Sequence, residues 1–400
     1  MTGSAVLTDR VRCLSALDES AVLPGRYELL DADNATLRLR DMAGRERECT
    51  DLMSAYASVN FGHRNPFIEQ ALRRSSDLAA LFHVPEAEQV AAWLCGRLGR
   101  ATDRRVLYQV GGSFAVSTAL ALARRHRPGR VLAIEGAFHG LGVDAAAVTT
   151  VQREFSLQDT GLPALVAGEV RHLRVGEVPR DWTGVSCLIF EPVQGANGYV
   201  PLPADWLHEL VMTARAAGVV TIADEIQCGF YRHGTLSPST AAGLDADITL
   251  YGKSLTNGMY PLSAVVYRRF LEERATAPVY LAHTFQTATL GPVAAAQVCR
   301  YIDENDVGAM AGAVETQLSR LAEHLTSHGL ARRVYLTGPA LSFEPLGVSS
   351  RDIVRRAFDD GVLVFAGGSH GERIRIAPPL TTPAAQLAAA ITTIRSALPG

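Results

Sequence analysis

The stretch Val219-Val-Thr-Ile-Ala-Asp-Glu-Ile-Gln227 joins a run of β-branched and small apolar residues to two consecutive carboxylates. A short apolar run of this kind is typical of a strand that is buried on both faces, as the inner strands of a parallel sheet are. Ligands of open parallel sheets bind outside the carboxyl ends of the strands. The stretch therefore predicts a strand at 219–223 that presents Asp224 and Glu225 at the functional edge of a parallel sheet.

Similar apolar runs recur on both sides of this stretch and alternate with alanine-rich segments. Strands that alternate with helices favour βαβ units, and hence a mainly parallel sheet with helices on both faces. The fold class predicted by this order is α/β. The further predicted strands lie at 106–110, 131–134, 187–190, 247–251 and 264–267, and the predicted helices between strands include 115–125 and 203–217.

Both ends of the chain depart from this central pattern. Residues 27–60 show the alternation of a short antiparallel unit with a turn at Gly44. Residues 301–400 contain a long amphipathic pattern over about 308–328, then mixed strand and helix patterns, then a last helix from Pro383. We therefore expect a large domain at 61–300 and a small α+β domain formed by 1–60 together with 301–400.

The composition excludes several classes of protein. The chain has 400 residues, of which 48% are hydrophobic and 20% charged, as in ordinary globular proteins. A net charge of −3 predicts no binding of nucleic acid or of an anionic membrane, and no apolar run approaches the ~20 residues that span a bilayer. Six scattered cysteines without a CxxC pair and the lack of a signal-peptide pattern predict a cytoplasmic protein with reduced thiols.

Lys253 is the only lysine among 38 basic residues, since the other 37 are arginines. A guanidinium stays protonated, whereas a lysine amine can lose its proton and form a Schiff base. In a chain this rich in arginine, a lone lysine favours a position that requires a primary amine. The alternative is a surface lysine retained by chance. Lys253 follows the predicted strand 247–251 after one glycine, which places it at the same edge of the sheet as Asp224.

A third feature at this edge is Gly111-Gly112-Ser113, between a predicted strand and a predicted helix. Glycines there allow backbone amides to approach an anion at the positive end of the helix, although such a turn alone is a weak signal. An anion seat, a buried carboxylate and one lysine amine together match what pyridoxal 5′-phosphate (PLP) requires. The phosphate needs backbone donors, the ring nitrogen needs a carboxylate, and the aldehyde needs an amine.

Six motifs in order give the chain a family resemblance over about residues 50–380. The chain resembles the class III aminotransferases of the ornithine and GABA aminotransferase group, which belong to the fold-type I superfamily of PLP-dependent enzymes. The motifs are Ser58-Val-Asn-Phe-Gly-His63, Ala137-Phe-His-Gly140, Glu191-Pro-Val-Gln-Gly195, Ile222-Ala-Asp-Glu-Ile-Gln227, Tyr251-Gly-Lys-Ser254 with Tyr260-Pro-Leu-Ser-Ala-Val265, and Arg375-Ile-Ala-Pro-Pro379.

The resemblance implies a cofactor role for each matched residue. Lys253 would form the Schiff base with PLP and move the proton between the substrate Cα and the cofactor, while Asp224 would pair with the pyridinium nitrogen. Gln227 would bond the phenolic oxygen. The other implied cofactor residues are Ile226 and Phe138 on the two faces of the ring, Glu191 of the Glu-Pro-Val-Gln motif, and Gly112 and Ser113 at the phosphate.

The resemblance also implies a homodimer with shared active sites and a small-molecule amino substrate. Thr284 of the partner subunit would help to seat the phosphate, Arg375 would bind a substrate carboxylate, and Tyr56 would contact the substrate. Each residue has a structural alternative: Phe138 and Tyr56 could belong to the core, and Arg375 could form a structural ion pair. His139 is expected to orient backbone or pack.

No metal site is expected from the sequence. His324 and His328 have the i, i+4 spacing of metal ligands, but the run between them lacks the acidic residue of HExxH. A pair of histidines at a helix end is the better interpretation. Binding of NAD is disfavoured because no GxGxxG follows the early strands.

Four departures from the family pattern bear on function. Phe114 stands where most relatives have a glutamate beside the phosphate seat. Ala196 stands where the ornithine branch has a glutamate that pairs with the arginine matched by Arg375. Gln286-Thr-Ala-Thr289 replaces Gly-Gly-Asn-Pro, and Lys253-Ser-Leu-Thr-Asn-Gly258 replaces Lys-Ala-Leu-Gly-Gly-Gly. The cofactor residues are kept while the substrate rim differs, which favours an unusual substrate or an altered reaction in specialised metabolism.

Two reactions follow from these residues. The first is transamination between an amino acid or amine and a keto acid through Lys253. The second uses the same Lys253 and Asp224 but diverts the carbanion to decarboxylation, racemisation, β/γ-elimination or replacement, or carbon–carbon bond formation. A non-catalytic PLP-binding protein would be expected to lose one of the two residues, and both are present.

Overall fold

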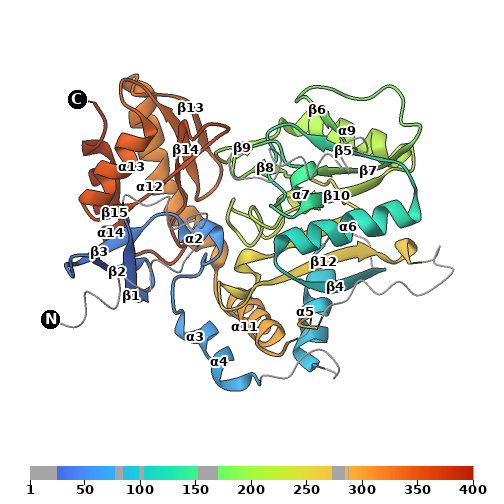
Figure 1. Cartoon of the computed structure of the whole chain (residues 1–400), viewed down its shortest axis with the longest axis horizontal. Helices are drawn as coiled ribbons and strands as arrows, with labels where there is room; N and C mark the ends of the chain where they lie inside the picture. Colours follow the sequence, from blue (N-terminus) through green and yellow to red (C-terminus); the bar gives the residue numbers. More distant parts are fainter. Residues whose placement is uncertain are drawn as a thin grey trace.

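The computed structural model describes residues 25–76, 84–98, 103–151, 170–272, 284–286 and 288–399. The chain forms two lobes (Figure 1). One lobe surrounds a large sheet from the middle of the sequence, and the other is assembled from both ends of the sequence, so that blue and red segments lie together. Within the described ranges, no helix has the length and apolar character needed to cross a membrane.

The large lobe is built on a seven-stranded sheet with the order β4-β12-β11-β10-β7-β5-β6. β12 runs antiparallel to both of its neighbours, whereas the other neighbouring strands are parallel. All six predicted strands are present, and β6 is an additional one. The strands are β4 (Arg104–Val110), β5 (Arg130–Ile134), β6 (Val170–Leu173), β7 (Val185–Phe190), β10 (Val220–Asp224), β11 (Ile248–Tyr251) and β12 (Leu262–Arg268).

β10 lies in the middle of this sheet and is buried along its whole length. Val220 and Ile222 pack in the cluster that includes α6 (Gly112–His126). Val219 and Ala223 pack on the opposite face, in the cluster that includes α9 (Ala204–Ala216). Successive side chains of a strand point to opposite faces, so a strand covered by helices on both sides is buried on both faces, and its one hydroxyl, that of Thr221, donates to Asp247.

Three more helices cover the large sheet. α7 (Val143–Ala147) packs against α6, while α5 (Pro85–Cys95) and α11 (Leu290–Glu304) pack together at the β4 and β12 end. α6 begins after Gly111, whose φ of 81° is easily adopted only by glycine, and its last turn carries basic residues that suit the negative end of the helix dipole.

The second lobe joins the two ends of the sequence through hydrogen-bonded strands. In the sheet β1-β2-β3-β15, the late strand β15 pairs in parallel with the early strand β3, and a second sheet has the order β13-β14-β17-β16. The elements are β1 (Tyr27–Asp33), β2 (Thr36–Asp41), β3 (Glu46–Asp51), β13 (Ala331–Leu336), β14 (Leu341–Pro345), β15 (Val362–Leu363), β16 (Phe365–Gly367), β17 (Arg373–Ile376), α12 (Val307–Ser327), α13 (Ser350–Asp359) and α14 (Ala384–Ser396).

Short elements complete the fold. A two-stranded sheet pairs β8 with β9. These elements are α2 (Ser54–Ala57), α3 (Pro66–Glu69), α4 (Ala71–Arg74), β8 (Val193–Gln194), β9 (Val200–Pro201), α10 (Pro238–Ala241), η4 (Lys253–Thr256) and η5 (Arg269–Leu271).

A fully buried arginine, Arg232, connects the segment that follows β10 to the second lobe. Its guanidinium donates to Ser54 Oγ at 3.3 Å, Asn60 Oδ1 at 3.1 Å, and the carbonyl oxygens of Ala377 at 3.2 Å and Pro339 at 3.0 Å. Burial lowers the pKa of Arg232 to about 10. A buried cation is tolerated only when it is hydrogen-bonded, so these bonds hold the two lobes in one arrangement.

Candidate active site

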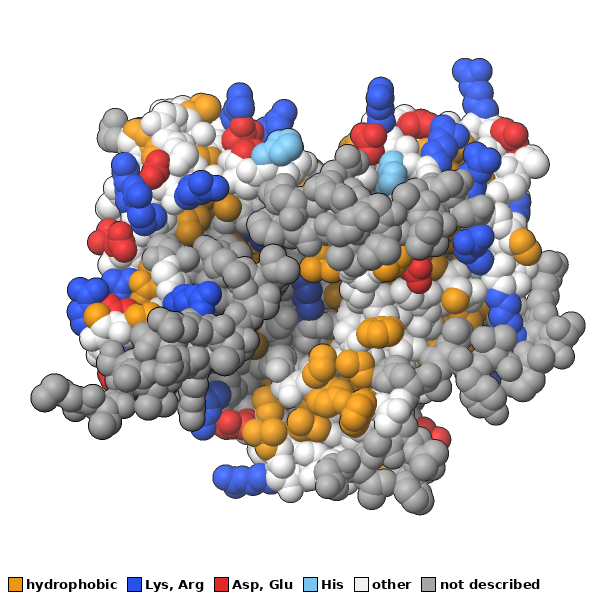
Figure 2. Space-filling view, viewed as in Figure 1, with side chains coloured by type: hydrophobic (Ala, Val, Ile, Leu, Met, Phe, Trp, Pro, Cys, Tyr) orange, Lys and Arg blue, Asp and Glu red, His pale blue; other side chains and the backbone are white. Residues whose placement is uncertain are grey.

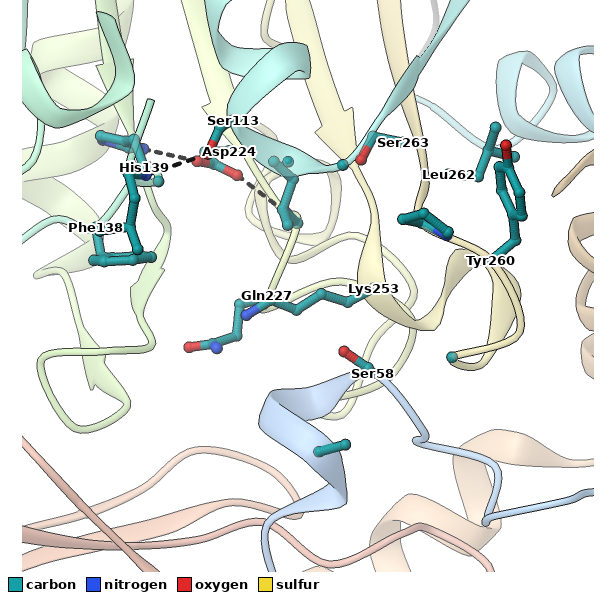
Figure 3. A pocket seen from close by; sticks show the side chains of 18 of the residues that line it. Ser58, Ser113, Phe138, His139, Asp224, Gln227, Lys253, Tyr260, Leu262 and Ser263 are labelled. Atoms are coloured by element: carbon teal, nitrogen blue, oxygen red, sulfur yellow. Dashed lines mark hydrogen bonds and ion pairs between the residues drawn. The ribbon is translucent and has the colours of Figure 1, made fainter. Parts of the chain in front are cut away.

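A cavity of about 730 Å³ lies at the carboxyl ends of the parallel strands, and Figure 3 shows the side chains around it. It gathers residues that are far apart in the sequence, from Ala55 to Ser263. Eight of the predicted site residues line it: Gly112, Ser113, Phe138, Glu191, Asp224, Ile226, Gln227 and Lys253.

Asp224 ends β10 and is held by two hydrogen bonds. Its Oδ1 accepts from the backbone N–H of Ile226 at 3.1 Å, and its Oδ2 lies 2.7 Å from Nδ1 of His139. Both side chains are buried. The carboxylate therefore has a fixed orientation, with the histidine on the side away from Ile226.

Lys253 follows β11, the parallel neighbour of β10, and begins η4. Because Asp224 is paired with Leu250 in the register of the two strands, Lys253 lies three residues beyond the partner of Asp224, at the same edge of the sheet. Figure 3 shows its side chain extended toward Gln227. The backbone of Lys253 has a φ of 46°, a left-handed conformation that is unfavourable for a non-glycine residue. Residues held in this conformation cluster at functional sites.

The amino end of α6 forms one end of the cavity, where Gly111, Gly112 and Ser113 lie. Ser113 Oγ accepts from the backbone N–H of Leu141 at 3.2 Å, and a side chain at Gly140 would collide with that oxygen. Ser263 Oγ also lines the cavity; it is buried and has no hydrogen-bond partner among the described residues. Helix-end amides and hydroxyl groups are suitable donors for a phosphate.

Ile226 and Gln227 form the floor of the cavity, and glycines make room for both. A Cβ at Gly112 or at Gly252 would each lie 3.2 Å from an Ile226 side-chain carbon, and a Cβ at Gly195 would collide with the Gln227 amide. Gln227 Nε2 donates to the carbonyl oxygen of Tyr56 at 3.4 Å. The Ile226 side chain is thus accommodated by Gly112 and Gly252, and that of Gln227 by Gly195.

Glu191 is a buried carboxyl group behind Phe138. Its Oε2 accepts from the backbone N–H of Phe138 at 2.8 Å, and its Oε1 accepts from that of Gly195 at 3.3 Å. Burial raises the pKa of Glu191 to about 7, with a smaller upward effect from Asp224 and an opposing effect from His139. Perturbed carboxyl groups in a cavity are typical of functional sites.

The predicted substrate residues lie beside the cavity and do not line it. Arg375 donates to the carbonyl oxygens of Gly195 at 3.3 Å and Ala366 at 3.2 Å, and it has no ion pair within the described part of the chain. The Tyr56 ring packs edge-on against Phe365 at 4.9 Å between centroids. Thr284 is exposed.

The bond from His139 to Asp224 was missed by sequence reasoning, which expected His139 to orient backbone or to pack. Its backbone N–H does bond Thr149, but its ring contacts the carboxylate that faces the cavity. The available signal was the place of His139 just after β5, at the same edge of the sheet as Asp224.

The two histidines that are spaced like metal ligands, His324 and His328, lie at the end of α12, and the centroids of their rings are 4.3 Å apart. His328 Nδ1 lies 3.0 Å from the carbonyl oxygen of His324. Among the residues that the structure describes, no three His, Cys, Asp or Glu side chains are grouped as metal ligands would be.

The residues around the cavity fit PLP. The unpartnered Ser263 hydroxyl and the helix end suit its phosphate, the apolar side chains of Ile226 and Phe138 that line the cavity suit the faces of a ring, and the fixed carboxylate of Asp224 suits a protonated ring nitrogen. Lys253 supplies the amine. The donor set therefore matches the cofactor in charge, shape and chemistry.

Comparisons with known proteins identify the family of the chain. The family described as aminotransferase class-III matches residues 32–398. Ornithine aminotransferase from Saccharomyces cerevisiae is 31% identical over 378 residues, which cover 86% of this chain and 87% of that protein. Ornithine aminotransferase from Bacillus subtilis is 29% identical over 235 residues, which are 56% of this chain and 58% of that protein.

Solved structures show the same fold. Ornithine aminotransferase from Toxoplasma gondii has a TM-score of 0.83 at 20% identity, and the match covers 99% of this chain and 98% of that one. The cavity and these matches define an enzyme of the PLP-dependent fold-type I class. The chain belongs to the class III aminotransferases, which use PLP to transfer amino groups.

Proposed function

We propose that this enzyme moves the amino group of a carboxylate-bearing amino acid to a keto acid, with Lys253 as the residue that carries PLP. The observation that supports this most directly is the convergence of Lys253, Asp224 and the amino end of α6 on one cavity. The proposal keeps the predicted division of the chain into a cofactor-binding domain at 61–300 and a small domain formed by 1–60 and 301–400. A cytoplasmic location and a role in specialised metabolism also belong to it.

Each cofactor residue has a defined task in this proposal. PLP, when bound, supplies an electron sink for the bond broken at the donor α-carbon. Lys253 Nζ accepts and returns the proton at that carbon, and Asp224 keeps a negative charge opposite the ring nitrogen. Gln227 orients the ring through its phenolic oxygen. The remaining cofactor residues hold the group in place: Gly112 and Ser113 at the phosphate, Phe138 and Ile226 on the ring faces, and Glu191 behind Phe138.

Arg375 is proposed to bind the donor carboxylate, beside Tyr56. Support comes from its hydrogen bonds, which go to two neutral carbonyl oxygens, and from its buried Nε, which lacks a partner among the described residues. Ala196 follows Gly195, whose carbonyl oxygen accepts from Arg375, and its own carbonyl oxygen accepts from the backbone N–H of Gly368 at 2.9 Å. A guanidinium bound to neutral groups keeps its charge available to a carboxylate.

The test of the reaction is a set of amino acids mixed with the holoenzyme in the absence of a keto acid. Transamination predicts that the aminated form of the cofactor accumulates and that one keto acid is released per site. Turnover that continues without an acceptor would contradict the proposal and favour elimination, decarboxylation or another diverted reaction.

The carboxylate site is tested with Arg375→Gln and Arg375→Lys. Because a hydrogen bond to a charged group contributes about 1.5–3 kcal/mol, Arg375→Gln should raise the KM of a carboxylate-bearing donor by about 10- to 100-fold. The KM of an amine without a carboxylate should change little. Equal effects on both donors would show that Arg375 has a structural role.

We further propose a homodimer in which Thr284 of the partner subunit completes the phosphate site. Support comes from exposed apolar side chains: Phe114 is 63% exposed and Phe285 is 56% exposed. Figure 2 shows further hydrophobic side chains gathered over α11. Exposed apolar side chains that gather on one face are typical of protein interfaces.

Mixing two inactive variants tests the shared site. If Thr284 acts across the dimer, then a hybrid of Lys253→Ala and Thr284→Ala subunits has one complete site, and random exchange of subunits should restore roughly a quarter of the sites. Light scattering would report the mass of the assembly. A monomer, or no recovery beyond the activity of the separate variants, would contradict the proposal.

A further inference from the structure

The wall of the cavity opposite the sheet begins with a left-handed turn. Ser54, Ala55, Tyr56 and Ala57 have φ values of 52°, 45°, 57° and 64°. The turn is closed by hydrogen bonds from the backbone N–H of Ala57 to Met53 O at 3.3 Å and from that of Ser58 to Ser54 O at 2.8 Å. L-residues adopt this conformation as single positions and not as runs, so four in succession must be held by their surroundings.

This turn and the residues after it contact the cavity directly. Ala55, Ser58, Val59 and His63 line it, and Figure 3 shows Ser58 facing the cavity. We refer to residues 54–63 as the wall segment. Its position sets the width of the cavity on the side opposite the sheet edge.

Two side chains beside Lys253 bind the backbone of the wall segment. Ser254 Oγ donates to Ala57 O at 2.6 Å. Asn257 Oδ1 accepts from the backbone N–H of Phe61 at 3.0 Å, and Asn257 Nδ2 donates to Gly62 O at 2.9 Å. Ser254 and Asn257 are both buried, and both belong to the turn that begins at Lys253.

We propose that Ser254 and Asn257 are positioning residues that hold the wall segment at a set distance from Lys253 and thereby determine how the amino donor binds. The inference rests on the proposed role of Lys253 as the reactive amine. Because the three hydrogen bonds join the wall segment to the turn that begins at Lys253, the wall segment is tied to the backbone that carries the amine. A donor that enters between them meets a preformed site, and its ordering upon binding costs less.

Both positions are departures of this chain from the family pattern. The motif Lys-Ala-Leu-Gly-Gly-Gly has alanine and glycine where this chain has Ser254 and Asn257. Neither alanine nor glycine can make a side-chain hydrogen bond, so the link between the two segments depends on the side chains of Ser254 and Asn257. It accounts for the polar residues next to Lys253, which the cofactor chemistry does not require.

Other bonds hold the wall segment from outside, so removing the two links should leave the fold intact. Arg232 donates to Ser54 Oγ, and Asp51 Oδ1 accepts from the backbone N–H groups of Met53 at 2.8 Å and Ser54 at 3.1 Å. Asn257 has a φ of 47° and a ψ of 44°, which glycine adopts without strain. The double variant Ser254→Ala, Asn257→Gly therefore removes the side-chain bonds and keeps the backbone geometry.

The experiment compares the double variant with the wild-type holoenzyme by hydrogen exchange and by half-reaction kinetics. Amides of residues 54–63, that of Phe61 above all, should exchange faster in the variant, while exchange in β10 and β11 stays unchanged. The KM of the amino donor should rise by about tenfold or more, with the absorbance of the lysine-linked cofactor preserved. Asn257→Asp keeps the acceptor for the Phe61 N–H, so its exchange rates and its donor KM should lie between those of the wild type and those of Asn257→Gly.

A matched control is Arg333→Gly, which also replaces a residue with positive φ, 49°, but lies in β13. It should leave both readouts unchanged. Unchanged exchange in residues 54–63, or faster exchange with an unchanged donor KM, would overturn the proposal. If the wild type fails to release a keto acid, then the proposed reaction fails, whereas the exchange measurement still reports whether the two side chains hold the wall segment.

Discussion

His139 Nδ1 lies 2.7 Å from Asp224 Oδ2, and both side chains are buried at the edge of the sheet. Since the remaining oxygen of Asp224 accepts from the Ile226 backbone, the histidine fixes the rotation of the carboxylate. A hydrogen bond to a charged group contributes about 1.5–3 kcal/mol. His139→Ala should therefore lower kcat by about 10- to 100-fold and weaken PLP binding, measured by titration of the apoenzyme.

His139→Asn is the informative companion, because the asparagine Nδ2 can take the place of the histidine Nδ1. It should recover part of the loss. His208→Ala, an exposed substitution on α9, is the control and should change neither quantity. Equal losses in the alanine and asparagine variants would argue for packing and against the hydrogen bond.

Lys253→Arg keeps a positive charge but removes the primary amine. A guanidinium is a poor nucleophile and stays protonated, so it cannot carry PLP or move the donor proton. Loss of the acid–base group alone should lower turnover by about 10²–10⁴-fold. The absorbance of the lysine-linked cofactor should also disappear, and retention of that absorbance would refute the role of Lys253.

The stability of the enzyme should fall with rising pH because of Glu191. Its pKa is about 7 in the folded chain against an ordinary 4.5, so the folded state binds the proton more tightly between these pH values. Ionisation above pH 7 then costs roughly 3 kcal/mol of folding free energy. The free energy of unfolding of Glu191→Gln, taken relative to that of the wild type, should therefore rise by roughly 2 kcal/mol as the pH rises from 5 to 8.

Urea unfolding at fixed PLP concentration measures this difference at each pH. A difference between the two proteins that stays constant over this range would contradict the raised pKa. Glu86→Gln on the surface helix α5 serves as a control and should show no such trend.

His233 has the opposite effect on stability. Burial lowers its pKa from 6.5 to about 3, and its Nδ1 lies 2.9 Å from the Thr337 carbonyl oxygen. The unfolded chain therefore binds the proton more readily, and stability is lost as pH falls below 6.5. The wild type should lose roughly 2 kcal/mol from this group between pH 7 and pH 5.

His233→Asn cannot titrate in this range. It should be less stable than the wild type at pH 7, because a buried contact is lost, but its unfolding midpoint should change less between pH 7 and pH 5. Parallel pH profiles for the two proteins would show that His233 does not remain neutral in the folded chain.

Much of the large sheet could be predicted because its signals are local. The apolar run before Asp224 forms β10, and Lys253 follows β11 after one glycine, as the sequence indicates. The antiparallel direction of β12 has no such signal, since Leu262–Arg268 is as apolar as the strands of the sheet that pair in parallel. Strand direction depends on the connection and on the partner strand, and not on the residues alone.

The features of the candidate site likewise include some that local sequence patterns predict and others that depend on packing. The lone lysine and the glycines at the phosphate end of the site are visible in the sequence as local patterns. The partner of Asp224, in contrast, is His139, which lies 85 residues away. Arg375 was matched by its motif, but its hydrogen bonds to Gly195 and Ala366 were not foreseeable. Packing decides which side chains far apart in the sequence become partners, and such partners produce no periodic pattern in the sequence.

By itself, the sequence determined the α/β class, the amine at Lys253, the carboxylate at Asp224 and, through its motifs, the cofactor. Only the tertiary structure decided how those groups are held. The bond between Asn257 and Phe61 joins residues 196 positions apart, and the left-handed turn of Ser54–Ala57 exists because its surroundings hold it against its own conformational preference. Residue type and spacing indicate which chemical groups are available, whereas the geometry of those groups arises from contacts that form when distant segments pack together.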